Sequence, residues 1–76
     1  MNKEQLIGAI ENEVYSLMEN QGLEELESVE VDLEDGEIKE IIVNGDYGIN
    51  TSLETDLEGN EIDLICDEIV ARSTEN

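Results

Sequence analysis

Near the N-terminus, apolar residues recur every three or four positions, which is the period of an amphipathic helix. Asn2 followed by Gln5 has the spacing of a capping box, and Gly22 is suited to end a helix in the left-handed conformation. We therefore predict a helix over residues 3–20, with an apolar stripe formed by Leu6, Ile7, Ile10, Val14, Leu17 and Met18.

The pattern then changes to the two-residue period of strands. Between residues 29 and 34, valine and leucine alternate with acidic residues, which is typical of a half-buried strand. The dipeptides Asp35-Gly36 and Asn44-Gly45 are strong signals for tight hairpin turns. They bound the runs 37–43 and 46–54, so we predict a three-stranded antiparallel meander.

Two-residue loops at both turns would fix the register of the meander. They would place Leu33 opposite Ile38, Asp32 opposite Lys39, Val29 opposite Ile42, Ile42 opposite Tyr47 and Ile38 opposite Thr51. The apolar face, covered by the N-terminal helix, would carry Val29, Val31, Leu33, Ile38, Ile42, Tyr47, Ile49 and Leu53. The other face would carry Glu30, Asp32, Glu34, Glu37, Lys39, Asp46 and Glu54.

Three residues do not fit this register. Glu40 falls on the apolar face, whereas Ile41 and Val43 fall on the acidic face. Either a β-bulge shifts the register, or Ile41 and Val43 contact another chain. The second explanation predicts a homodimer, which would also compensate for the thin core of so short a chain. The sequence leaves both explanations open.

A second helix is predicted over residues 60–72. Asn60 and Asp63 form a plausible cap pair, and apolar residues follow at helical spacing: Ile62, Ile65, Cys66, Ile69 and Val70. A strand at 61–66 is the alternative, and residues 73–76 are expected to fray. The prediction is an α+β fold of order α-β-β-β-α, with residues 1–76 forming a single domain.

The composition is strongly acidic, and this narrows the classes of partner. The net charge is −19, the hydrophobic fraction is 38%, and the only aromatic residues are Tyr15 and Tyr47. Such values raise intrinsic disorder as an alternative, but the regular aliphatic spacing and the absence of proline favour a folded chain. The N-terminus does not resemble a signal peptide, and no apolar run is long enough to span a membrane. We expect a cytoplasmic protein that binds neither nucleic acid nor membranes directly, and whose partner is basic.

Catalysis, cofactors and a dedicated metal site are not expected. The chain has no histidine and a single cysteine, Cys66, whose place on the apolar stripe predicts a core residue. The nearest calcium-loop candidates are Asp32–Gly36, where the glycine comes one position early, and Asp56–Asn60, where Glu61 replaces the required glycine. An acyl carrier protein is similar in size and acidity, but it is all helical. The segment Thr51–Glu54 also lacks the aspartate that precedes the carrier serine.

The charge pattern is the main functional signal. Between Glu24 and Glu40 lie nine acidic residues and one lysine. They could form an ordinary solvated face, yet solubility needs a net charge of only ~2–8. Carboxylates repeating every ~7 Å along a strand and ~4.8 Å between strands would imitate the phosphates of a duplex, which proteins contact with Arg, Lys and backbone N–H groups. The predicted partner-binding residues are Glu30, Asp32, Glu34, Asp35, Glu37, Asp46 and Glu54.

Small size, extreme acidity, few aromatic residues and the segment VEVDLEDGEIKE give the chain a resemblance to phage-encoded DNA-mimic proteins. Within that family it looks most like the inhibitors of the nucleoid-associated protein HU. The resemblance implies competition with DNA for a basic surface on a protein of the host cytoplasm. The family shares no motif, so no residue is carried over from it. The alternatives are an anti-CRISPR or anti-restriction inhibitor, and an antitoxin-like protein that binds through the apolar strand 38–43.

Overall fold

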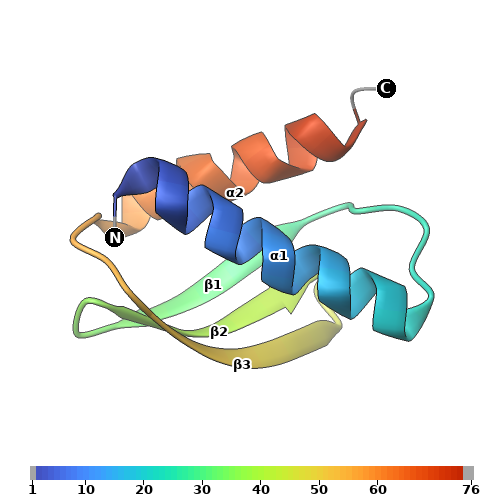
Figure 1. Ribbon diagram of the computed structural model, residues 1–76, viewed down its shortest axis with the longest axis horizontal. Helices are drawn as coiled ribbons and strands as arrows, with labels where there is room; N and C mark the ends of the chain where they lie inside the picture. The colour runs from blue at the N-terminus through green and yellow to red at the C-terminus, as the bar shows by residue number, and fades with distance from the viewer. Residues whose placement is uncertain (1, 75–76) are drawn as a thin grey trace.

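The computed structural model describes residues 2–74 and confirms the predicted α-β-β-β-α order. The elements are α1 (Lys3–Gln21), β1 (Val29–Glu34), β2 (Glu37–Val43), β3 (Tyr47–Glu54) and α2 (Gly59–Thr74). The strands form one antiparallel sheet in the order β1-β2-β3. Both helices lie on the same face of this sheet (Figure 1), α2 mainly over β1 and α1 over β2 and β3.

The ends of α1 follow from local sequence as predicted. The Asn2 side chain accepts a hydrogen bond from the Gln5 N–H (2.8 Å), and the Gln5 side chain accepts one from the Asn2 N–H (3.0 Å). Gly22 ends the helix with φ 68°, a left-handed conformation that costs glycine little. The helix extends to Gln21, one residue beyond the predicted end.

Residues 61–66 belong to a helix, so the strand alternative for this segment is wrong. The predicted cap is wrong as well, because the Glu58 carbonyl accepts the first hydrogen bonds, from Glu61 N and Ile62 N. Asn60 therefore lies inside the first turn of α2. The helix continues through Thr74, so residues 73 and 74 are helical rather than frayed, whereas positions 75 and 76 lie outside the described residues.

The pairing of β1 with β2 follows the predicted register only next to the first turn. Leu33 pairs with Ile38 as expected. The register then shifts at Lys39, which has no Cα partner in β1, and Asp32 pairs with Glu40 instead of Lys39. The β-bulge alternative is therefore confirmed, and the predicted pairing beyond this point is wrong.

The bulge turns the second half of β2 over, so that its apolar residues enter the core. Ile41 and Val43 are completely buried, whereas Ile42 turns to the opposite side of the sheet and is only half-buried. Val29 accordingly pairs with Val43 rather than with Ile42. Ile41 and Val43 therefore cannot contact another chain. The homodimer predicted from their exposure loses that basis.

The second hairpin also differs from prediction, because its turn covers residues 44–46 rather than two residues. The β2–β3 pairing has a further register shift, at which two residues of β3, Thr51 and Ser52, lie opposite a single residue of β2, Lys39. Two predicted pairs are therefore wrong: Val43, not Ile42, pairs with Tyr47, and Ile38 pairs with Leu53, not with Thr51.

Asn44 has a structural role beyond its turn. Its side-chain oxygen accepts hydrogen bonds from Glu27 N (2.7 Å) and Ser28 N (3.2 Å), and its amide donates to the Glu25 carbonyl (3.0 Å). Its φ is 55°, a left-handed value that asparagine tolerates better than most residues. One side chain thus connects the loop after α1 to the second hairpin.

The buried apolar residues of both helices and the sheet form one continuous cluster. It consists of Leu6, Ile7, Ile10, Val14, Leu17, Leu26, Val29, Ile38, Ile41, Val43, Ile62, Ile65, Cys66 and Ile69. No large aromatic ring is among them, so aliphatic packing on the helix-covered face provides most of the hydrophobic stabilisation.

The bulge predicts unequal losses of stability when two adjacent isoleucines, Ile41 and Ile42, are replaced by alanine. Ile41→Ala should lower the free energy of unfolding by about 2–5 kcal/mol, because it creates a cavity in the core. Ile42→Ala should cost clearly less, since Ile42 lies on the other side of the sheet. Urea denaturation followed by circular dichroism measures both changes. An equal or reversed ranking would contradict the bulge, because a regular register would bury Ile42 instead.

Candidate functional site: an acidic sheet surface

The sheet has one face that no helix covers (Figure 1), and we call it the outer face. Along each strand, buried or half-buried side chains alternate with more exposed ones, except at the bulge. The alternation places the following residues on the outer face: Glu30, Asp32, Glu34, Glu37, Lys39, Glu40, Ile42, Gly48, Asn50, Ser52 and Glu54.

One end of the outer face carries a row of three carboxylates. Glu34 pairs with Glu37, and Glu37 pairs with Glu54, so the three residues lie side by side on β1, β2 and β3. Neighbouring strands are ~4.8 Å apart. Asp35 extends this group from the tight turn between β1 and β2, where its φ is 50°. Four of the predicted binding residues are therefore brought together here.

Local hydrogen bonds keep the centre of this row ionised. Glu37 Oε1 accepts a hydrogen bond from Ser52 Oγ (2.7 Å) and forms an ion pair with Lys39 Nζ (3.0 Å). The Ser52 hydrogen bond and the Lys39 interaction lower the pKa of Glu37. The pKa of Lys39 is raised, first by Glu37 and then by the nearby charges of Glu34 and Asp35.

The middle of the outer face contains Glu40, which the sequence prediction had assigned to the apolar face. The bulge brings Glu40 between Asp32 on β1 and Asn50 on β3. Its carboxylate lies over Gly48, where an added Cβ would be 2.6 Å from Glu40 Oε2. In the sequence, the only sign of this placement was that two polar residues, Lys39 and Glu40, follow each other and interrupt the alternation of apolar and polar positions.

The opposite end of the outer face is less acidic. Glu30 pairs there with Ile42, which in turn pairs with Gly48. Asp46 lies in the second turn, at the end of the sheet away from Glu54. The structure therefore assembles Glu30, Asp32, Glu34, Asp35, Glu37 and Glu54 into one surface, but it does not bring Asp46 to the carboxylate row.

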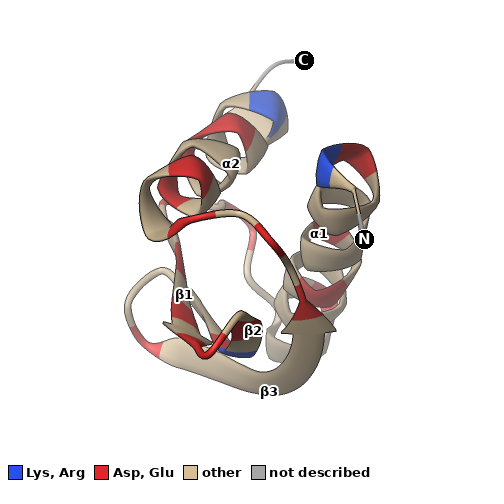
Figure 2. Cartoon of the chain, turned by 90° about the vertical axis from the view of Figure 1, so that its left-hand side faces the viewer, with Lys and Arg blue, Asp and Glu red and all other residues tan. Residues whose placement is uncertain are grey.

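Few positive charges oppose this field. Lys39 is paired with Glu37, and Arg72 contacts Glu11 (3.6 Å) and Glu68 (3.0 Å) on the helical side. Figure 2 shows acidic positions along β1 and both helices, whereas β3 has hardly any. With 22 acidic against 3 basic residues, the chain has a strongly negative potential, and its acidic charge on the sheet lies mainly on β1 and β2.

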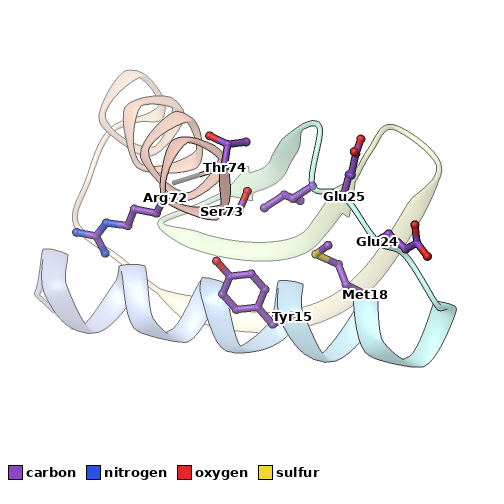
Figure 3. Close-up of a pocket in the computed structure, with 8 residues that line it drawn as sticks. Tyr15, Met18, Glu24, Glu25, Arg72, Ser73 and Thr74 are labelled. Atoms are coloured by element: carbon purple, nitrogen blue, oxygen red, sulfur yellow. The ribbon is translucent and has the colours of Figure 1, made fainter. Parts of the chain in front are cut away.

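A groove of about 680 Å³ lies on the helical side (Figure 3). Tyr15 and Met18 line it from α1, Glu24 and Glu25 from the following loop, and the end of α2 from the other side. The hydroxyls of residues 73 and 74 donate hydrogen bonds to helix carbonyls (2.8 and 2.9 Å), and the guanidinium of residue 72 is paired with carboxylates. These polar groups are thus engaged by the chain itself.

Cys66 lines a second groove, between α2 and β1, whose acidic lining residues are Glu27, Glu30, Asp63 and Asp67. Burial, and then the charges of Asp63, Asp67 and Glu30, raise the pKa of the Cys66 thiol to about 11. A thiol in this environment is a poor nucleophile. Within residues 2–74, no three His, Cys, Asp or Glu side chains are placed so that they could hold a metal ion.

Comparisons with protein-family models, with curated proteins and with solved structures gave no match to this chain. Neither helix in the described part of the chain is long and apolar enough to cross a membrane. Ser52, the nearest candidate for a carrier-protein serine, lies within β3 and donates its hydroxyl to Glu37, whereas carrier proteins are all helical. A function must therefore be inferred from the fold and the site.

The crowding of carboxylates predicts that salt stabilises the fold. Raising monovalent salt from ~10 mM to ~300 mM shortens the Debye length from about 30 Å to well under 10 Å, which weakens the self-repulsion of the folded state. The melting temperature, followed by circular dichroism at pH 7, should rise. A flat or falling curve would mean that the ion pairs of Lys39 and Arg72 contribute more to stability than the repulsion removes.

The buried thiol predicts slow alkylation. At pH 8, iodoacetamide should react about 100-fold more slowly with the folded chain than with the chain in urea, because the thiolate is the nucleophile and the pKa of Cys66 is raised from 9.0 to about 11. For the same reason, folding stability should fall as pH rises from 9.0 towards about 11, where only the unfolded chain releases the proton. Mass spectrometry measures the rate; equal rates would place Cys66 at the surface.

Proposed function

We propose that the protein is an acidic DNA mimic, which binds the DNA-binding surface of a basic protein of the nucleoid-associated HU type and blocks DNA binding there. The observation that supports this most strongly is the uncovered outer face, on which Glu34, Glu37 and Glu54 lie in register across three strands. The HU type is the target implied by the resemblance to phage DNA mimics, so the protein would act in the host cytoplasm.

The outer face offers the kind of acceptors that a duplex offers. DNA-binding proteins contact phosphates through Arg, Lys and backbone N–H groups, and carboxylate oxygens accept hydrogen bonds from the same donors. Spacings of ~4.8 Å across the strands and ~7 Å along them present several carboxylates to one basic surface. Opposite potentials on the two proteins would also accelerate association.

The acidic residues are held on a rigid support, which favours binding. The helices pack on the inner face, and Ser52 and Lys39 fix the central carboxylate of the row. Because these side chains lie on strands rather than on a mobile loop, less conformational entropy is lost when a partner binds.

The antitoxin-like alternative receives no support from the fold. It requires the apolar side chains of strand 38–43 to contact a partner, yet Ile38, Ile41 and Val43 are completely buried in the core. An anti-CRISPR or anti-restriction inhibitor would use the same acidic surface against a different target. Capture of host proteins from a lysate, with and without competing DNA, distinguishes these targets.

The decisive experiment titrates the protein into a preformed complex of fluorescent duplex DNA with an HU-type protein. If the two ligands share one surface, anisotropy should fall as DNA is released, and the effect should weaken as salt is raised. Replacing Glu30, Asp32 and Glu34 together by Lys should weaken binding more than tenfold, because attraction to the partner's Arg and Lys side chains becomes repulsion. These positions are exposed, so the fold should persist.

The matched control reverses three exposed acidic residues on the helical side, Glu19, Glu24 and Glu25, and thus makes the same change in net charge. It should bind considerably more tightly than the strand variant. From the sequence alone, charge reversal at position 75 would be another control, but that position lies outside the described residues. A ternary complex with DNA, or equal weakening by both triple variants, would mean that the outer face is only a solvated surface.

A further inference from the structure

The free edge of β3 is the part of the sheet with the least charge. The run Tyr47–Leu53 contains no charged residue, and it is the longest such run in a chain with 22 acidic residues. In the order β1-β2-β3, this strand pairs with β2 on one side only. Within residues 2–74 no strand pairs with its other side, so the backbone N–H and C=O groups there are a template for another strand.

The two edges of the sheet differ in a way that matters for association. β1 carries Glu30, Asp32 and Glu34 at its exposed positions, and charged side chains are a common means of preventing edge-to-edge pairing. β3 has Gly48, Asn50 and Ser52 at its exposed positions before the terminal Glu54, and Figure 2 shows the contrast between these two strands. Charge protects the β1 edge along its whole length, whereas on β3 it is confined to Glu54 at the end of the strand.

The part of α1 beside this edge is also nearly neutral. Arg72 of α2 contacts Glu11, and Tyr15 lines the groove between the helices, so these residues mark the side of α1 that faces α2. At 100° per residue, the side turned away from α2, towards the free edge of β3, carries Gln5, Ala9, Glu13, Ser16 and Asn20. Glu13 is the acidic residue in this group.

We propose that β3 pairs antiparallel with β3 of a second copy of this chain, so that the two sheets become continuous. The distribution of charge favours a second copy of the chain over a basic protein at this edge. A basic partner would be attracted more strongly to the acidic edge of β1, whereas a copy of equal negative charge can approach closely only where charge is low. The proposal is independent of DNA mimicry, because it concerns the edge and not the outer face.

A two-fold axis at Ile49 gives a register in which no like charges of residues 44–54 lie in direct opposition. It places Ile49 opposite Ile49 of the second copy and Tyr47 opposite Thr51, which are aliphatic and aromatic–β-branched pairs of the kind that stabilise sheets. Glu54 then lies opposite Asn44. An axis at Asn50 would instead place Glu54 opposite Asp46, two like charges in direct opposition.

The pairing would also cover surface that is incompletely buried in the single chain. Tyr47, Ile49 and Leu53 pack against the core but remain half-buried. A second sheet edge beside them would remove further apolar area from water, which favours association by roughly 25 cal/mol per Å². A chain with so thin a core benefits from this burial.

Sedimentation equilibrium in ~300 mM salt, from about 5 to 500 µM protein, tests the proposal. We expect a species of twice the 8.5 kDa chain mass, whose dissociation constant falls as salt screens the repulsion. Asn50→Asp should raise that constant about fivefold, since it gives β3 the charge that β1 has in the same row at Asp32. Asn60→Asp on α2 is the matched control and should change it less than twofold.

Nuclear magnetic resonance on a mixture of labelled and unlabelled chains provides a second readout that needs no variant. Methyl contacts between Ile49 of one copy and Ile49 of the other should appear, and they remain measurable if Asn50→Asp fails to fold. A mass of 8.5 kDa at the highest concentration would overturn the proposal. So would equal effects of both variants, or a dimer without contacts between the Ile49 side chains.

Discussion

Mutual repulsion among the carboxylates is the constraint on which the rest of the structure depends. With a net charge of −19 on 76 residues, acidic groups cannot be buried without large cost, so they must occupy surface while a small set of aliphatic residues holds the chain together. The fold meets this constraint by placing both helices on one face of the sheet. The other face is left free to carry charge, and the repulsion is spread over strands ~4.8 Å apart.

The separation of apolar and acidic faces depends on the bulge at Lys39. Without it, Glu40 would enter the core and Ile41 and Val43 would lie on the acidic face. Skipping one residue returns both apolar side chains to the core and adds Glu40 to the outer face beside Asp32. The same displacement leaves Lys39 on the outer face, where it pairs with Glu37 and relieves repulsion within the carboxylate row.

The elements were predictable from the sequence because their signals are local. The capping box at Asn2, the helix terminator at Gly22 and the turns at Asp35 and Asn44 each depend on a few neighbouring residues, and each is present in the structure. The register was not predictable, because the position of the bulge depends on which side chains become buried in all three strands together. No single strand carries that information. The sequence flagged the misfit of Glu40 without resolving it, and the hydrogen bonds of Asn44 to the distant loop gave no local signal.

The candidate site was predictable to the extent that it lies before the bulge. Glu30, Asp32 and Glu34 keep their places on the outer face under either register, because β1 itself is regular. Glu40 changes faces because it follows the displaced residue. Asp46 lies apart from the carboxylate row because it belongs to the second turn, at the other end of the meander from Glu54. In a regular strand, the alternation of residue types in the sequence predicts which face of the sheet each side chain occupies. In a meander, the same prediction holds only up to the first bulge. The acidic surface is therefore best defined on β1. The free edge of β3, at the other side of the three-stranded sheet, became evident only in the fold.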